Sequence, residues 1–242
     1  MTDSNSAVTA AEAVPRGHRP DGPNAGILAI VSLVLTVASV LLPTAFAGGE
    51  FFPSPTGSTS AVAAYFSGHR SAVVATGFLV FAASVPLGIY AATTYARLLR
   101  LGVRVPGPNI GFFGGIAASV LLSISGLVTW AAGQPISGLS SALLHTLAYL
   151  IYALGGVGFV GGLGLLVAGI AVPALVLRLT PRWLAWLGLV LAALAELSFL
   201  ALVVPPLAFL LPIGRFLGLA WLLVVGLILP RSRHDVPARE AK

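Results

Sequence analysis

The chain contains no cysteine and very little charge, and both absences restrict what it can be. Without cysteine it can form no disulfide, no thiolate metal site and no thiol nucleophile. Charged residues make up 8% of the 242 residues and hydrophobic residues 57%, whereas about a quarter of an ordinary soluble domain is charged. A soluble fold of this length cannot cover so much apolar surface with so few charges. The composition therefore predicts an integral membrane protein.

Acidic residues are scarce, and none lies between Glu50 and Glu196. The net charge of +6 comes from scattered basic residues, which do not form the clustered basic face that nucleic-acid binding needs. The four histidines are also scattered, so no metal-ligand spacing is visible. The apolar blocks contain no aspartate and no nucleophile with a base at a useful spacing. We therefore predict no enzymatic activity, no metal, no cofactor and no nucleic-acid partner.

Long apolar blocks predict an all-α fold, a polytopic transmembrane helical bundle of six spans. A spanning helix needs about 20 apolar residues, and each block reaches that length. The blocks cover residues 25–47, 71–96, 111–132, 142–177, 183–204 and 207–229. Residues 1–24 lack an apolar period and predict a disordered cytoplasmic tail, and residues 230–242 predict a basic cytoplasmic tail.

The basic residues indicate the orientation of the bundle. An even number of spans places both termini on one side, and all thirteen basic residues except Arg70 and Arg215 fall on that side. By the positive-inside rule, both termini are predicted to be cytoplasmic. Lys242 is the single lysine among them, a bias typical of a GC-rich genome. We expect a multi-pass protein of a bacterial inner (plasma) membrane.

The first span and the loop after it each admit two interpretations. Ala45-Phe46-Ala47 resembles a signal-peptidase site, but the block 25–47 is longer than the roughly 7–15 apolar residues of a signal peptide. We predict a retained span, with a cleaved signal as the alternative. The outer loop 48–70 either only connects two spans or carries recognition. Its sequence AVAAYFSGHR predicts a short interfacial helix with Tyr65 and Phe66 at headgroup level.

Small residues predict how the helices pack, because apolar burial does not drive helix association in lipid. The fourth block carries a seam of small residues with a seven-residue period: Ser141, Ala148, Gly155, Gly162 and Gly169. The third block carries a four-residue series: Gly111, Gly115, Ser119 and Ser123. The fourth block is also longer than the roughly 30 Å hydrocarbon core requires. We expect it to tilt, to project beyond the bilayer, or to bend near its glycines or Pro173.

The same block contains a G-x-G-x-x-G pattern formed by Gly156, Gly158 and Gly161. A dinucleotide-binding loop needs a preceding strand, a following helix and an acidic residue about 20 positions later. Here helix-length apolar sequence lies on both sides, and the next acidic residue is Glu196. We therefore predict a packing surface and no nucleotide partner.

Five residues with polar groups fall inside the spans and form a candidate intramembrane polar site: His145, Tyr149, Tyr152, Glu196 and Arg215. Glu196 precedes Pro205 by as many residues as Arg215 follows Pro206, so a hairpin would place both at matching depth, where they could form an ion pair. The group either handles protons or solutes in a pocket that opens outward, or it is a structural ion pair with His145 and Arg215 reaching the interface.

Two segments resemble a family of uncharacterised bacterial membrane proteins with six spans. One is TSAVAAYFSGHRSAVVATGFLVFAASVPLGIYA, and the other is RLTPRWLAWLGLV followed later by LLPIGRFLGLAWLLVVGLIL. Members of that family often carry an acidic residue near the position of Gly218, and this chain has none there. The family's function is unknown, so the resemblance implies topology and transfers no site residue.

These patterns favour a non-enzymatic membrane protein that acts through helix packing or partner binding. Its predicted surroundings are the lipid bilayer and an unidentified membrane-protein partner. The alternative is a small-solute or proton-coupled transporter with an outward pocket around Glu196. The two halves of the chain show no convincing repeat, which mildly favours the first interpretation.

Overall fold

The structure is a computed structural model that describes residues 22–136 and 138–230. The described chain is helical and contains no strands. Six of its helices are long and apolar enough to cross a membrane, as the apolar blocks predict. The chain is therefore a multi-pass membrane protein. Most of the predicted tail 1–24 and nearly all of the predicted tail 230–242 lie outside the described residues.

The first three spans are single α-helices, the fourth contains a π-helical turn, the fifth ends in a 3-10 turn, and the sixth contains both kinds of turn. The elements are α1 (Ala25–Phe46), α2 (Thr59–Gly68), α3 (Arg70–Arg100), α4 (Pro106–Ala132), α5 (Ser141–Tyr152), the π-helical η1 (Ala153–Gly158), α6 (Phe159–Val176), α7 (Arg182–Leu197), the 3-10 helices η2 (Ser198–Leu202) and η3 (Pro205–Phe209), α8 (Leu210–Pro212), the π-helical η4 (Ile213–Leu217) and α9 (Gly218–Ile228). The third span begins five residues before its predicted start because Pro106 occupies the first turn of α4, where proline is well tolerated.

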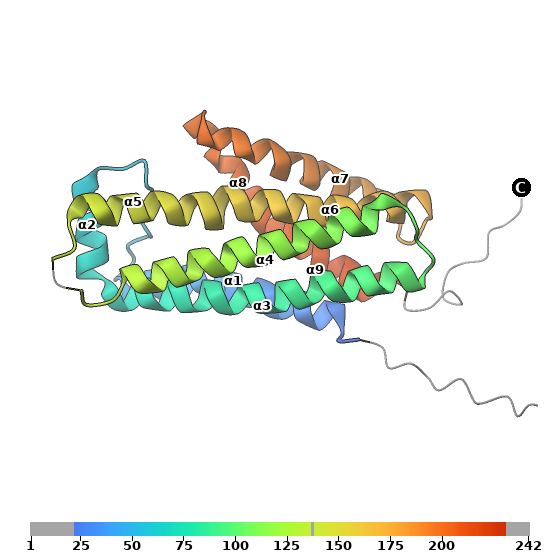
Figure 1. The fold of residues 1–242 in the computed structure, drawn as a ribbon, viewed down its shortest axis with the longest axis horizontal. Helices are drawn as coiled ribbons and strands as arrows, with labels where there is room; N and C mark the ends of the chain where they lie inside the picture. The colour runs from blue at the N-terminus through green and yellow to red at the C-terminus, as the bar shows by residue number, and fades with distance from the viewer. Residues whose placement is uncertain (1–21, 137, 231–242) are drawn as a thin grey trace, which may run out of the picture.

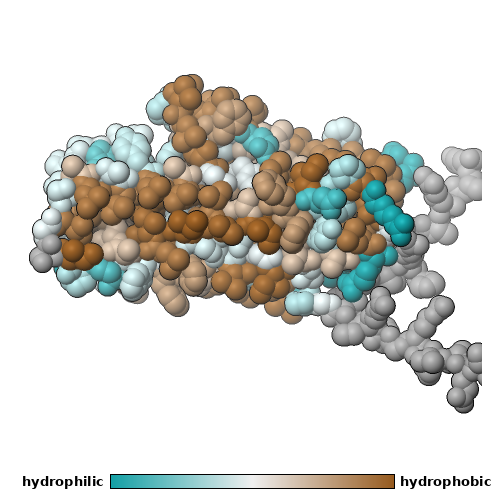
Figure 2. Space-filling view, viewed as in Figure 1, coloured by the Kyte–Doolittle hydropathy of each residue, from teal (hydrophilic) through white to brown (hydrophobic). Residues whose placement is uncertain are grey.

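The long helices run roughly along the long axis of the bundle, and α2 stands across one end (Figure 1). The start of α1 and the end of α9 lie together, since a Cβ on Gly226 would meet the backbone of Ala25 at 3.0 Å. Hydrophobic residues cover the middle of the surface, while pale and teal residues gather at the two ends (Figure 2). We call the end that holds Arg100 and Arg178 the basic end, and the end that holds α2 the capped end.

The over-long fourth span is one continuous helix made of α5, η1 and α6. Its wide π-helical turns coincide with the glycine-rich stretch after Tyr152. The part toward the capped end, α5, packs against α2, and Leu144 and Ala148 share a buried cluster with Val62 and Phe66. The extra length of the span therefore contacts protein from the first loop.

Close packing along this span follows the predicted seam from Ala148 onward: Ala148 is buried, and a Cβ on Gly155 would meet the side chain of Ser125. A Cβ on Gly162 would lie 2.7 Å from the backbone nitrogen of Ala118, and one on Gly169 would lie 2.3 Å from that of Gly111. Ser141, by contrast, is exposed. A strict seven-residue stripe drifts by about 20° per heptad around a straight helix, and the first position of the seam has accumulated the largest drift.

The opposite face of α4 packs against α3 in the same way. A Cβ on Gly77 would meet the carbonyl oxygen of Gly126 at 2.7 Å. Hydroxyls join the two helices: Ser119 donates to the carbonyl of Ser84 at 2.8 Å, and the Ser84 and Ser123 hydroxyls lie 2.6 Å apart. The predicted series in the third block therefore faces α3, except for Gly111, which faces α6. Helix α4 thus has small residues on two faces.

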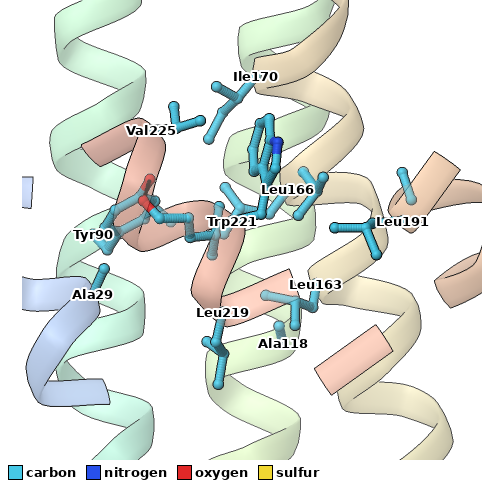
Figure 3. Packing of buried hydrophobic residues seen from close by; sticks show 14 of the residues in the cluster. Ala29, Tyr90, Ala118, Leu163, Leu166, Ile170, Leu191, Leu219, Trp221 and Val225 are labelled. Atoms are coloured by element: carbon cyan, nitrogen blue, oxygen red, sulfur yellow. Dashed lines mark hydrogen bonds between the residues drawn. The ribbon is translucent and has the colours of Figure 1, made fainter. Parts of the chain in front are cut away.

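Large side chains fill the half of the bundle toward the basic end. Tyr90 is fully buried on α3, and its hydroxyl donates to the carbonyl of Leu222 at 2.8 Å. The indole nitrogen of Trp221 donates to the carbonyl of Leu184 at 2.8 Å. Both rings lie among aliphatic side chains from several helices (Figure 3). Each buried aromatic thereby satisfies its polar group by joining two spans.

Two adjacent glycines provide a matched test of this packing. Gly162 faces α4, whereas a Cβ on Gly161 would meet nothing within 4 Å. Gly162→Ala should therefore lower stability by about 1–3 kcal/mol through overpacking. Gly161→Ala should leave it unchanged or raise it by up to about 1 kcal/mol through helix propensity. Thermal unfolding of both purified variants measures the difference, and equal melting temperatures would contradict the close α4–α6 contact.

Candidate functional site

A cavity of about 370 Å³ lies toward the capped end, between α1 and α5. Its walls come from four spans: Pro43 of α1, Val80 of α3, Leu122 of α4 and Ile151 of α5. The segment before α2 contributes residues 51–55, and Arg215 of η4 completes the lining. The cavity therefore lies between the spans, is partly covered by the first loop and is partly open to the surface.

Residues 51–58, which we call the cover, are held on α5 by His145. Its Nε2 lies 2.7 Å from the carbonyl oxygen of Pro55, and its Nδ1 lies 2.7 Å from the Thr59 hydroxyl. A carbonyl can only accept, so Nε2 carries a proton and donates it there. In the neutral ring, Nδ1 then accepts from Thr59. His145 also stacks on Tyr149, with ring centroids 5.1 Å apart.

Aromatic contacts also hold the cover against α2. Phe52 makes edge-on contacts with Tyr65 and Phe66, at centroid distances of 5.6 and 5.4 Å. Tyr65 and Phe66 are 6% and 2% exposed. The two rings therefore pack against protein, in a cluster that includes Ala47 and Phe52 of the first loop, and their place at headgroup level stays a prediction.

Tyr65 is among the residues that line the cavity, while its hydroxyl oxygen is buried in the protein with no hydrogen-bond partner in the described chain. Burial raises the pKa of this phenol, and the negative charge of Glu50 raises it further. The phenol therefore stays protonated at neutral pH and can donate a hydrogen bond. The Oε2 atom of Glu50 itself lies 3.2 Å from the Nε2 atom of His69.

Hydroxyl side chains also line the walls, but their protons are already engaged. Thr76 donates to the carbonyl of Ala72 at 2.9 Å, and Thr129 donates to that of Ser125 at 2.7 Å. Ser125 donates across helices to the carbonyl of Ile151 at 3.1 Å. These oxygens can offer a ligand only their lone pairs.

Arg215 provides the positive charge of the cavity. Its guanidinium donates to the carbonyl of Gly155 and lies 5.0 Å from the centroid of the Phe159 ring. The π-helical turn prepares this contact, because the N–H of Phe159 donates to the carbonyls of Leu154 and Gly156 and passes over that of Gly155. The non-α geometry of η1 thus gives the arginine an acceptor inside the bundle.

The expected ion pair between Glu196 and Arg215 is absent, although the two residues have the expected register. Gly214 packs against Ala195, since a Cβ on the glycine would lie 3.4 Å from its Cα. Arg215 follows Gly214 and Glu196 follows Ala195, so the backbones of the two charged residues lie close together. Their side chains have different neighbours: Glu196 Oε1 lies beside Gly164, whereas the Arg215 guanidinium donates to the carbonyl of Gly155. Nine residues of helix separate those glycines, about 13 Å at 1.5 Å per residue.

Side-chain direction explains this separation. Long side chains on a helix point toward its N-terminus. Helix α7 begins at the basic end, so Glu196 points toward that end, while the last span begins at the capped end, so Arg215 points there. In an antiparallel pair the same rule sends the two charges apart. Glu196 Oε1 is buried without a hydrogen-bond partner in the described chain and does not line the cavity.

The predicted five-residue polar site is therefore divided. Tyr152 and Arg215 line the cavity together, His145 on α5 holds the cover and stacks on Tyr149, and Glu196 lies between α6 and α7. The sequence reasoning did not single out Thr76, Thr129 or Tyr65 as cavity residues. Only the position of Thr129 four residues after Ser125 could have indicated a shared face.

In comparisons of the chain with models of known protein families, with curated proteins and with solved structures, no match was found. The resemblance to uncharacterised six-span bacterial proteins thus stays a prediction, and the site has to be judged from its own geometry.

The two hydrogen bonds of His145, which we call the clamp, give a direct prediction for the cover. His145→Ala removes the bond to Pro55 and the bond to Thr59 at the start of α2, so the backbone of residues 51–58 should exchange hydrogen at least about tenfold faster, if the two bonds contribute about 1 kcal/mol each. Thr146→Ala, on the exposed neighbour whose hydroxyl bonds only within α5, is the control. Hydrogen-exchange mass spectrometry measures both, and unchanged exchange in His145→Ala would contradict the clamp.

Proposed function

We propose that the protein is a non-enzymatic membrane protein that binds a small molecule in the cavity between α1 and α5. The single observation that carries this proposal is the position of Arg215, a charged side chain that lines an otherwise largely apolar cavity without a carboxylate beside it. Such charges inside spans usually mark a ligand or ion path. A largely apolar cavity with a few convergent polar groups is the usual form of a small-molecule site.

The proposal replaces the expected partner-binding role with a more specific one. The cavity has an ordered cover, and that cover uses specific side-chain contacts from His145 and Phe52. A segment that only connected two spans would not need to fold over an internal cavity. A membrane-protein partner remains compatible with this role, since the exposed apolar faces of the bundle are broad.

Transport of the same ligand is a second candidate, and the π-helical turns favour it. Both residues of the Arg215–Gly155 contact lie in such turns, η4 and η1. Turns of this kind interrupt α-helices mostly at functional sites. The transporter would then use Arg215 in place of the predicted pocket around Glu196.

We further propose a bacterial plasma membrane as the location, with both termini in the cytoplasm. Arg97, Arg100, Arg104, Arg178 and Arg182 belong to the turns and helix ends at the basic end. This agrees with the positive-inside rule, and the capped end would then face outward.

The absence of cysteine permits a clean test of this orientation. Thr56→Cys, in the exposed part of the cover, should react with a membrane-impermeant maleimide added to intact cells. Arg104→Cys, at the exposed turn of the basic end, should react only after the cells are opened. The reverse pattern would place the cavity on the cytoplasmic side.

A matched pair of threonines tests ligand binding. Thr76 and Thr146 both donate to the carbonyl four residues earlier, but only Thr76 lines the cavity. Thr76→Phe should fill the cavity, whereas Thr146→Phe adds the same ring to an exposed surface. Native mass spectrometry of the purified proteins should show a bound small molecule on the wild type and on Thr146→Phe, reduced at least about tenfold on Thr76→Phe, the loss expected from about 1.4 kcal/mol. Identical spectra for all three proteins would contradict the proposal.

A further inference from the structure

Few side chains in the deep wall of the cavity can donate a hydrogen bond to a ligand. The wall hydroxyls of Thr76, Ser125 and Thr129 already donate to backbone carbonyls. Among the lining residues of the spans, Tyr152 and the free N–H groups of Arg215 remain as donors. The guanidinium has five N–H donors, and one carbonyl does not satisfy them.

The charge of the cavity is equally one-sided. Among its lining residues there is no carboxylate, and Arg215 is the charged member. The carboxylates that the structure describes are occupied or distant: Glu50 pairs with His69, and Glu196 lies beside Gly164. A cation held inside a membrane bundle without a counter-ion is costly by several kcal/mol. An anion bound at Arg215 would offset that cost.

Arg215 and Tyr65 lie at opposite ends of the cavity, with apolar surface between them. Arg215 contacts Gly155, while Tyr65 belongs to the buried cluster that contains Ala148, seven residues earlier on the same helix. Seven residues of helix correspond to about 10 Å. The walls between are formed by apolar side chains such as Val80, Leu122 and Ile151.

The geometry points to an amphiphilic organic anion as the ligand, an inference that rests on the proposed binding function. Its carboxylate or phosphate accepts hydrogen bonds from Arg215 and Tyr152, and its apolar body lies along the wall toward Tyr65. Arg215 suits this task because its planar fork can bind both oxygens of one anionic group. The volume of about 370 Å³ lies within the range of small-molecule sites, about 300–1,000 Å³.

Three probes with the same eight-carbon chain separate charge from apolar contact: octanoate, octanol and octyltrimethylammonium. Each is titrated against the purified full-length protein in nanodiscs of uncharged lipid, and binding is measured by the shift in melting temperature and by calorimetry. We expect octanoate to bind at least about tenfold more tightly than octanol, the preference expected from one charge-assisted contact of about 1.5 kcal/mol. The cation should bind most weakly.

Arg215→Met should remove the preference for octanoate while keeping the binding of octanol within about twofold, because Met keeps the length and the apolar contacts of the side chain. Since loss of the guanidinium also leaves the Gly155 carbonyl unpaired, Tyr152→Phe serves as a milder variant. It should weaken octanoate alone, by about 3–10-fold for one hydrogen bond.

The outcomes distinguish the two proposals. If octanol and octanoate bind the wild type equally and Arg215→Met changes neither, the inference about the anion is wrong and the cavity still binds a ligand. If no probe binds the wild type and Thr76→Phe is indistinguishable from it in every measurement, the proposed function fails as well.

Discussion

The close approach of backbones along α4 is the constraint on which the rest of the bundle depends. In lipid, helices gain little from burying apolar side chains, so they associate where small residues let them pack tightly and where hydroxyls reach carbonyls. Helix α4 meets α6 through Gly111 and Gly114 and meets α3 through Gly115 and Gly126. These three helices form the rigid part of the molecule, and the other spans are arranged around it.

The cavity lies toward the capped end, although α3 and α4 still pack closely there, as the approach of Gly77 to the backbone of Trp130 shows. Helix α1 packs on α3, and α5 packs on α4, but the last span leaves the bundle there through η3, α8 and η4. Nothing in the described chain then fills the space between α1 and α5 except the segment before α2, which partly covers it. The same departure places Arg215 at the cavity wall. The cavity and the position of Arg215 in its wall therefore have one common cause, the irregular first half of the last span.

Glu196 and Arg215 have different surroundings because long side chains on a helix point toward its N-terminus. Glu196 and Arg215 have nearly matching positions on an antiparallel pair, yet each points toward the start of its own helix. The carboxylate reaches the α6–α7 contact and the guanidinium reaches the cavity. As a result the arginine keeps its charge available for a ligand, and a neighbouring carboxylate does not neutralise it.

The sequence by itself determined the class of protein, the number of spans and most of the small-residue surfaces on which the third and fourth spans pack. Those features depend on composition and on spacing along one helix, which are local properties of the chain. Only the tertiary structure decided which polar residues meet, because that depends on the rotation of each helix about its axis and on the path of the segments between them. Ser141 was predicted in the seam and is exposed, since a small drift per turn accumulates over a long helix. Tyr65 and Thr76 are far from Arg215 in sequence and share a cavity with it, since the fold of residues 47–58 and the π-helical turns are set by contacts between spans.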